Sequence, residues 1–373
     1  MSKKILFFAQ GLDMGGMAAA FLKIAKVMEE AGHEVKVVVP YAADVTKSVV
    51  PAKYILGYAK PRPPHIRGVT RLVRMFHILT RWKFYFRTVP KWEHDLLVVF
   101  RATDFYWTYY TNKNVIGWLH EIAPDMRDDI SWFEKTIWRR RLRRYKALVA
   151  VSDAVATSWA TRFALAEKPL VVQNIIDMAE LDEKKNDPVP DWPKVEAKTK
   201  MLVCVSRLTF EKGVDRLLAV LKTLRDESGN IHLLIIGDGA MRLQLEEFVS
   251  DNGLEKAVTF LGARENPYPY MRLADLVVCP SRAEGMGLVP LEALIVGTPV
   301  LATDSGGPKY ILRGGDFGGV VDNSQEGLYL GLKKFLNGEC DYKPKAGYGN
   351  VYRSIEMANE NSVCQIRTLI GEL

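Results

Sequence analysis

The chain has 373 residues, of which 48% are hydrophobic, and it carries a formal net charge of +7 at pH 7. This length favours two or more domains, and the apolar content supports a large core and excludes a disordered chain. The positive charge favours anionic partners, which are nucleic acid, acidic lipid or phosphorylated substrates.

The amino terminus and the cysteines are typical of a cytoplasmic protein. Residues 1–8, MSKKILFF, look like the start of a signal peptide, but Gln10 and Asp13 interrupt the apolar run and no small-residue cleavage site follows. We expect a first strand here and no membrane-spanning segment anywhere. Cys204 and Cys279 lie in apolar runs, and no CxxC pair occurs, so we expect free thiols in a reducing compartment rather than disulfides or a zinc site.

Short apolar runs alternate with helix-forming segments along the chain. In the first half, a helix that stops at Gly32 follows the first strand, and the strands are predicted at 4–10, 34–40, 95–100, 114–120 and 147–152. The same alternation of strands and helices begins again after residue 200, with strands predicted at 200–207, 232–239, 258–262, 275–281 and 299–303. Continuous β-branched strands separated by helices are typical of parallel sheets covered on both faces. The predicted fold class is α/β, with two Rossmann-like, doubly wound halves.

A polar stretch separates the two halves. Residues 177–200 contain Pro188, Pro190 and Pro193, and they read as a linker. We therefore place an amino-terminal domain at 1–174 and a second domain at 175–345. A helical segment at 346–373 is expected to pack back on the first domain.

The turns that follow the strands are where an open parallel sheet binds ligands. In the first half, Gly15 and Gly16 precede a helix, where backbone N–H groups can approach an anion. His120 ends another predicted strand. A glycine pair in a tight turn or a single histidine is also compatible with a purely structural role.

In the second half, cations and carboxylates occupy such turns. Arg207 and Lys212 lie on one loop before a helix, where two cations can hold a diphosphate, although solvated surface cations are the alternative. Glu284 and Glu292 flank a glycine-containing loop and the start of a helix that Gly297 ends. Carboxylates accept hydrogen bonds from sugar hydroxyls, so the stretch predicts a phosphate between sugar rings. The alternative for Glu292 is a simple interaction with the helix dipole.

The combination of motifs resembles a retaining glycosyltransferase of family 4, with the GT-B fold, of the type that builds bacterial cell-surface glycans. The matching segments are EGMGLVPLE at 284–292, VSRLTFEKGVDRLL at 205–218, IGDGAMRLQLE at 236–246, VAVSDAVA at 149–156 and NIID at 174–177. Met286 stands where the family often has phenylalanine, and Tyr310 where it often has glutamate.

The resemblance implies a role for each matching position. Arg207 and Lys212 would hold the donor diphosphate and stabilise the leaving nucleotide, and Glu292 would hydrogen-bond the ribose. Glu284 would contact hydroxyls of the transferred sugar. His120 would face the sugar and acceptor, completing a catalytic set with Arg207, Lys212 and Glu284. The other donor-binding positions implied are Gly15, Gly16, Gly285, Met286, Gly287 and Leu288.

The resemblance also implies the type of reaction. A hexose-type sugar would pass from a UDP- or GDP-sugar with retention of configuration, either by same-face attack within an ion pair or through a covalent intermediate on Glu284. Arg207, Lys212 and a helix terminus can stabilise the leaving phosphate, and no DxD-type carboxylate pair stands in a suitable context. We therefore expect no cofactor and no metal.

Two basic runs in the first half predict a membrane surface as partner. Residues 59–92 contain nine Lys or Arg and no Asp or Glu. Within them, the residues expected to contact membrane or acceptor are Arg71, Arg74, Arg81 and Trp82. A second run spans Trp138 to Lys146. This composition is typical of an interfacial helix on anionic lipid, which places the chain on the inner face of the cytoplasmic membrane with a lipid-linked or lipopolysaccharide-type glycan as acceptor. The alternative is a solvated basic face.

Other functions remain open at this stage. A basic protein with interleaved aromatics can bind nucleic acid, but no nucleic-acid motif accompanies the charge, so we expect none. A GT-B nucleotide-sugar epimerase or glycan phosphorylase would share the donor site, and donor turnover without acceptor would favour the epimerase. A catalytically silent membrane scaffold would bind no nucleotide.

Overall fold

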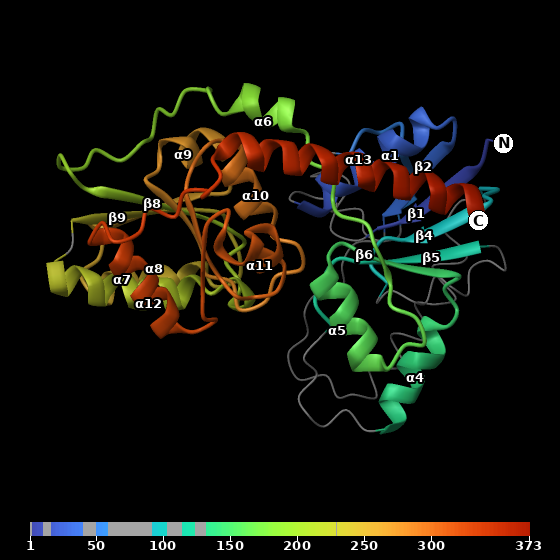
Figure 1. Ribbon diagram of the computed structural model, residues 1–373, viewed down its shortest axis with the longest axis horizontal. Helices are drawn as coiled ribbons and strands as arrows, with labels where there is room; N and C mark the ends of the chain where they lie inside the picture. Colours follow the sequence, from blue (N-terminus) through green and yellow to red (C-terminus); the bar gives the residue numbers. More distant parts are fainter. Residues whose placement is uncertain are drawn as a thin grey trace. The chain divides into compact units, whose positions relative to one another are not determined.

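The structure is a computed structural model that describes residues 2–9, 16–39, 50–58, 92–102, 114–123, 132–228 and 230–373 (Figure 1). The chain divides into two units. Unit 1 contains Met1–Ile176 and Ala358–Leu373, and unit 2 contains Asp177–Met357. Each unit is built around its own parallel sheet.

The sheet of unit 1 has the strand order β3-β2-β1-β4-β5-β6-β7, and every described pairing is parallel. Its strands are β1 (Lys4–Phe8), β2 (Glu34–Val39), β3 (Ile55–Tyr58), β4 (Leu96–Val99), β5 (Asn114–Leu119), β6 (Ala147–Ala150) and β7 (Leu170–Val171). Its helices are α1 (Gly16–Glu30), α4 (Trp132–Leu142), α5 (Asp153–Phe163) and the carboxyl-terminal part of α13 (Tyr348–Glu372).

The core of unit 1 is closed by aromatic side chains. The rings of Phe7 and Phe21 meet edge to face with centroids 5.1 Å apart, and Phe100 lies 5.7 Å from Phe7. All three side chains are fully buried. Edge-to-face pairs stabilise a core beyond the area that they bury, so this contact fixes α1 on β1 and β4.

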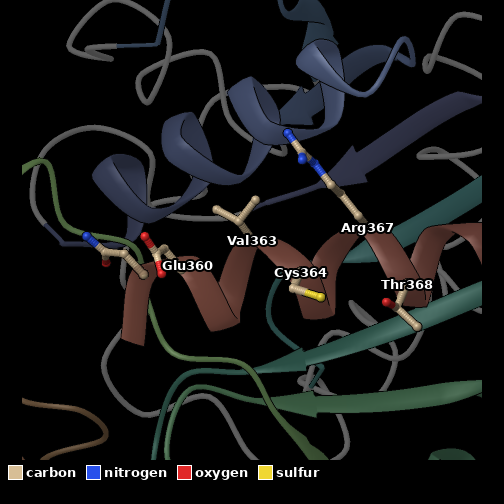
Figure 2. Close-up of a pocket in the computed structure, with 6 residues that line it drawn as sticks. Glu360, Val363, Cys364, Arg367 and Thr368 are labelled. Carbon is tan, nitrogen blue, oxygen red and sulfur yellow. The ribbon is translucent and has the colours of Figure 1, made fainter. Parts of the chain in front are cut away.

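The end of α13 belongs to unit 1 through hydrogen bonds as well as packing. The amine of Lys3 donates to the carbonyl of Ile370, and Asn114 donates to the carbonyl of Leu373. Asn359 both donates to and accepts from the backbone of Ile176. The same stretch of α13 lines a hollow of about 430 Å³, and its lining residues are Asn359, Glu360, Val363, Cys364, Arg367 and Thr368 (Figure 2).

The sheet of unit 2 has the order β10-β9-β8-β11-β12-β13. Its strands are β8 (Lys200–Val205), β9 (Ile231–Ile236), β10 (Val258–Gly262), β11 (Leu276–Cys279), β12 (Val300–Thr303) and β13 (Gly319–Val321). One face packs against α7 (Val214–Ser228), α8 (Arg242–Asp251) and α12 (Gln325–Leu336) in a continuous apolar cluster. The other elements are α6 (Met178–Lys184), α9 (Tyr268–Leu273), α10 (Leu288–Ile295), α11 (Gly307–Ile311) and the 3₁₀ turns η2 (Phe210–Lys212) and η3 (Arg313–Gly315). In Figure 1, α9 and α10 lie across the sheet of unit 2 from α7 and α12.

The strand order of unit 2 decides where a ligand can bind. Taken in chain order, the strands lie 3-2-1-4-5-6, so the first and fourth, β8 and β11, are neighbours at the centre of the sheet. From this pair the chain adds β9 and β10 on the side of β8, and β12 and β13 on the side of β11. The loops after β8 and β11 therefore lie side by side at the carboxyl edge, which is the usual ligand site of such sheets.

The predicted α/β class, with two doubly wound parallel sheets, is confirmed. The predicted strands appear as β1, β2, β4, β5 and β6 in unit 1 and as β8 to β12 in unit 2. The short strands β3, β7 and β13 were not predicted. In the described ranges, no helix is long and apolar enough to cross a membrane.

Candidate functional site

The loops that follow β8 and β11 are bonded to each other. The backbone N–H of Arg282 donates to the carbonyl of Glu211, at 2.7 Å. The Arg282 guanidinium donates to both carboxylate oxygens of Asp215, at 2.7 and 2.6 Å, and to the carbonyl of Phe210. It also stacks over the Phe210 ring, 4.0 Å from the centroid. These contacts hold loop 206–213 and loop 280–287 in one arrangement.

The centre of this arrangement is an ion pair between Lys212 and Glu284. The Lys212 Nζ lies 2.5 Å from Oε2 of Glu284, and the two side chains are 16% and 22% exposed. The hydroxyl of Ser281 donates to the same oxygen, at 3.1 Å. The backbone of Glu284 is fixed as well, because its N–H donates to Ser305 and its carbonyl accepts from Gly307. The ammonium group of Lys212 has three hydrogens, so the pair leaves donors for an anionic ligand.

Arg207 stands at the rim of the same loop. It is exposed and lies two residues after the end of β8. The pKa of the Glu211 carboxyl is lowered by a backbone N–H and the Thr209 hydroxyl, and further by the positive charges of Arg207 and Lys212. The loop thus concentrates positive charge at the carboxyl edge of β8.

Glu292 occupies a different environment on α10. Its side chain is partly buried, and burial raises the pKa of Glu292 to about 7. On α9, burial raises the pKa of Tyr268, and the negative charges of Glu292 and then Glu180 raise it further. The carboxylates of Glu292 and Glu180 therefore both lie near the phenol of Tyr268. A carboxyl with a pKa near 7 changes between hydrogen-bond donor and acceptor at physiological pH.

The backbone between the two glutamates is largely enclosed. Gly285, Met286 and Gly287 are buried, and Leu288 begins α10. Gly287 is the cap residue of this helix and has no side chain to bond the amides of the first turn. The hydroxyl of Ser305, which is buried beside Glu284, has no partner among the described residues. Ser305 was not predicted as a site residue.

The site residues predicted in the first half lie in unit 1. Gly16 is the exposed first residue of α1. His120 directly follows β5, and its ring lies 4.4 Å from that of Phe100. Burial, with a contribution from the charge of Arg101, lowers the pKa of His120 to about 3, so the imidazole is neutral. Its buried Nε2 has no hydrogen-bond partner in the part of the chain that the structure describes.

Several predicted residues fall outside the described ranges. They are Gly15, Arg71, Arg74, Arg81 and Trp82. The second basic run is described: Trp138 packs against Trp159 and Phe163, with ring centroids 6.3 and 5.5 Å away, while Arg140 and Arg143 are exposed at the end of α4.

Sequence reasoning missed the buried arginine that supports these loops. Arg216 is 7% exposed, and its Nε and Nη2 donate to the carbonyl of Pro280 at 2.9 and 2.7 Å. A signal existed, because Arg216 precedes Val220 and Leu224 by four and eight positions, on the apolar stripe of α7. A cation on such a stripe is rarely buried without a set of acceptors, so it indicates a buried polar partner.

Two family models match the chain. One, described as "Glycosyl transferases group 1", matches residues 190–349, and the other, "Glycosyltransferase Family 4", matches residues 14–180. The lipopolysaccharide core biosynthesis mannosyltransferase LpsB of Rhizobium meliloti is 32% identical over 196 residues, which is 49% of this chain and 54% of the relative. A GDP-mannose-dependent alpha-(1-6)-phosphatidylinositol monomannoside mannosyltransferase of Mycobacterium tuberculosis is 29% identical over 248 residues, 62% of this chain and 64% of the relative. Both alignments thus span less than two thirds of the relative.

Solved structures match over nearly the full length. HepE of Anabaena, in complex with UDP and glucose, superimposes with a TM-score of 0.70 at 19% identity, covering 99% of this chain and 98% of the other. Sucrose-phosphate synthase of Thermosynechococcus elongatus superimposes with a TM-score of 0.76 at 16% identity and the same coverage. With the two family models on its two halves, the chain belongs to glycosyltransferase family 4 and has the GT-B fold.

Proposed function

We propose that this glycosyltransferase moves a hexose-type sugar, with retention of configuration and without a metal, from a UDP- or GDP-sugar to a membrane-associated glycan. The observation that carries the proposal is the Lys212–Glu284 pair at the carboxyl ends of β8 and β11, with the exposed Arg207 on the same loop as Lys212. Positive groups and a carboxylate are what a sugar diphosphate requires, since it has negative oxygens at one end and hydroxyls at the other.

The two cations act on the leaving group. Cleavage of the bond between the sugar and the phosphate places negative charge on the departing diphosphate and positive charge on the sugar. Lys212, held at 2.5 Å from Glu284, is already oriented before the donor binds, so little reorganisation is needed as charge develops. Arg207 presents a planar set of donors that suits two phosphate oxygens. The first-turn amides of α10 add a third source of partial positive charge.

The carboxylates recognise the two sugars of the donor. Glu284 accepts hydrogen bonds from hydroxyls of the transferred sugar while it remains paired with Lys212. Glu292, on α10, accepts from the ribose hydroxyls. In unit 1, the neutral imidazole of His120 has an Nε2 with no partner among the described residues, which suits a hydrogen bond to a sugar or acceptor hydroxyl. Gly16 at the start of α1 is proposed to approach the phosphates.

The relatives support the donor and acceptor classes. HepE was crystallised with UDP and glucose, and also with UDP-glucose. The relatives of Rhizobium meliloti and Mycobacterium tuberculosis are named for transfer of mannose to lipopolysaccharide core and to a phosphatidylinositol mannoside. We therefore propose a nucleotide-sugar donor and a lipid-linked or lipopolysaccharide-type acceptor for this chain.

A membrane surface is the proposed location, on the inner face of the cytoplasmic membrane. The end of α4 exposes Arg140 and Arg143, and Lys146 follows, while Trp138 anchors the helix on α5. Clustered cations of this kind bind the anionic headgroups of lipids. The basic segment 59–92 is proposed to add to this surface.

Replacing Arg207 with alanine tests the leaving-group role. A panel of nucleotide sugars first identifies the donor by the rise in melting temperature that a bound ligand causes. Turnover of that donor should fall about 10²-fold or more in Arg207→Ala, because a preorganised charge at the leaving group is lost. Lys222→Ala is the matched control, since Lys222 is a partly exposed cation of unit 2 that pairs with Asp226 on its own helix. Equal turnover in Arg207→Ala and the control would reject the role.

The pKa of Glu292 predicts a pH dependence of donor binding. Only the ionised carboxylate accepts two hydroxyl donors, so affinity for the donor should rise as pH increases through about 7. Isothermal titration from pH 5.5 to 8.5 measures it, and a nucleotide sugar serves as ligand because its diphosphate does not titrate in this range. Glu292→Gln should flatten the profile, and an unchanged profile would contradict the ribose contact.

The same group makes a prediction for stability that does not involve the ligand. The folded pKa of about 7 lies above the ordinary value of 4.5, so the folded chain holds this proton more tightly than the unfolded chain. The contribution of Glu292 therefore favours folding below about pH 4.5 and is lost as pH rises through 7. As pH rises from about 4.5 to about 7, the melting temperature of Glu292→Gln should therefore rise relative to that of the wild type.

Charge reversal tests the membrane surface. Replacing Arg140, Arg143 and Lys146 together with glutamate should weaken binding to vesicles of anionic phospholipid on the order of 10²-fold, at about 1 kcal/mol for each cation. Co-sedimentation measures the bound fraction, with vesicles of neutral phospholipid as control. A second variant, with glutamate in place of Arg71, Arg74 and Arg81, measures the contribution of the basic run at 59–92 separately from that of the run at 138–146. Full binding by both variants would contradict a basic membrane surface.

A further inference from the structure

Arg216 is a buried cation whose hydrogen bonds all go to the carboxyl edge of the sheet of unit 2. Its Nε and Nη2 donate to the carbonyl of Pro280, and Nη2 also lies 2.8 Å from the carbonyl of Ser281. The remaining acceptors are Asn323 Oδ1 at 2.7 Å and Thr303 Oγ1 at 3.3 Å. The charge is thus satisfied by dipoles of the loop after β11, of Thr303 in β12 and of Asn323 just after β13.

Burial of this guanidinium has a cost, because desolvation of a charge is unfavourable and lowers the pKa of Arg216. The nearby carboxylate of Asp215 favours the charged form, but its oxygens bond to Arg282. In other proteins, well-packed apolar side chains often replace buried charges without loss of stability. What the arginine does specifically is to orient the two consecutive carbonyls of Pro280 and Ser281 toward its guanidinium group.

These two carbonyls determine where the following side chains lie. Ser281 donates its hydroxyl to Glu284 Oε2, which in turn holds Lys212. Asn323 joins the two arginines of this region: its Oδ1 accepts from Arg216, while its Nδ2 donates to the carbonyl of Arg282, at 2.8 Å. A chain of hydrogen bonds therefore runs from the buried guanidinium to the carboxylate and amine of the site.

We propose that Arg216 is a positioning residue for sugar transfer: its buried guanidinium sets the peptide planes of Pro280 and Ser281 and thereby places Glu284 and Lys212 for the donor. The inference rests on the proposed function of that pair. Arg216 touches no substrate in this account. Its contribution is made through Ser281, and it is realised before the donor binds.

The test compares Arg216→Gln with a control of similar burial. The control is His232→Gln, because His232 is 5% exposed in the same unit and its ring nitrogens bond to Lys256 and Thr259, near the start of β9 and away from the carboxyl edge. Hydrogen exchange of the ligand-free proteins is followed in peptides that contain the Glu284 and Gly307 amides, both of which are bonded in the wild type. Turnover and UDP affinity are then measured well below the melting temperature of each variant.

Arg216→Gln should speed exchange at the Glu284 and Gly307 amides about tenfold or more and lower kcat on the order of 10²-fold, since a displacement of about 1 Å at reacting groups has an effect of this size. His232→Gln should leave both quantities at the wild-type level even where its melting temperature falls as much. Arg216→Lys should recover part of the protection, because one ammonium can bond both carbonyls. In a Glu284→Gln background, the further loss of kcat caused by Arg216→Gln should be small, because both changes act through the same carboxylate.

The outcomes separate the two proposals. If the wild type binds UDP but Arg216→Gln resembles the control in exchange and kcat, the positioning role is overturned. Additive losses of kcat in the double variant would overturn it too. If loop exchange accelerates in Arg216→Gln while the wild type binds no nucleotide, the proposed function fails and the control of the loop by Arg216 stands.

Discussion

The ion pair of Lys212 and Glu284 is the interaction on which the proposed site depends. It joins the loops after β8 and β11, the two central strands of unit 2, at the point where the winding of the sheet reverses. Each charge is mostly removed from water, so removal of either partner would leave the other uncompensated. In the free protein the carboxylate keeps the amine oriented, and in the proposed complex the spare hydrogens of that amine turn to the diphosphate.

The surrounding structure constrains this pair from several sides. Arg282 clamps the outer side of the two loops through Asp215 and Phe210, and Arg216 holds the inner side through the carbonyls of Pro280 and Ser281. Preorganised polar groups stabilise developing charge without the cost of reorganising during the reaction, which is the physical reason to fix these loops so firmly. Burial raises the pKa of Glu292, on α10, to about 7.

Much of this architecture was predictable from the sequence. Continuous apolar runs between amphipathic segments predict parallel strands, and the rule that such sheets bind ligands at their carboxyl edge brings Arg207, Lys212 and Glu284 to one region. The pairing of Lys212 with Glu284 was not predictable, because the two residues are 72 positions apart and only the strand order makes them neighbours. The pKa of Glu292 likewise depends on burial among α6, α9 and α10, which periodicity does not reveal. Strands β7 and β13 have two and three residues, too few to form a recognisable apolar run, and Gly57 interrupts the run of β3.

The role of Arg216 could be inferred only in part from sequence. Its place on the apolar stripe of α7 indicates a buried acceptor, but the acceptors are backbone carbonyls, which carry no sequence signal of their own. Backbone acceptors of this kind are visible only in the folded chain, as are the hydrogen bonds that tie Asn359 to Ile176.

A crystal structure of the protein with UDP tests the central claim most directly. We predict that the diphosphate lies at the loops after β8 and β11, within hydrogen-bonding distance of the Lys212 amine and the Arg207 guanidinium, with the ribose against Glu292. Phosphates bound away from both cations would contradict it.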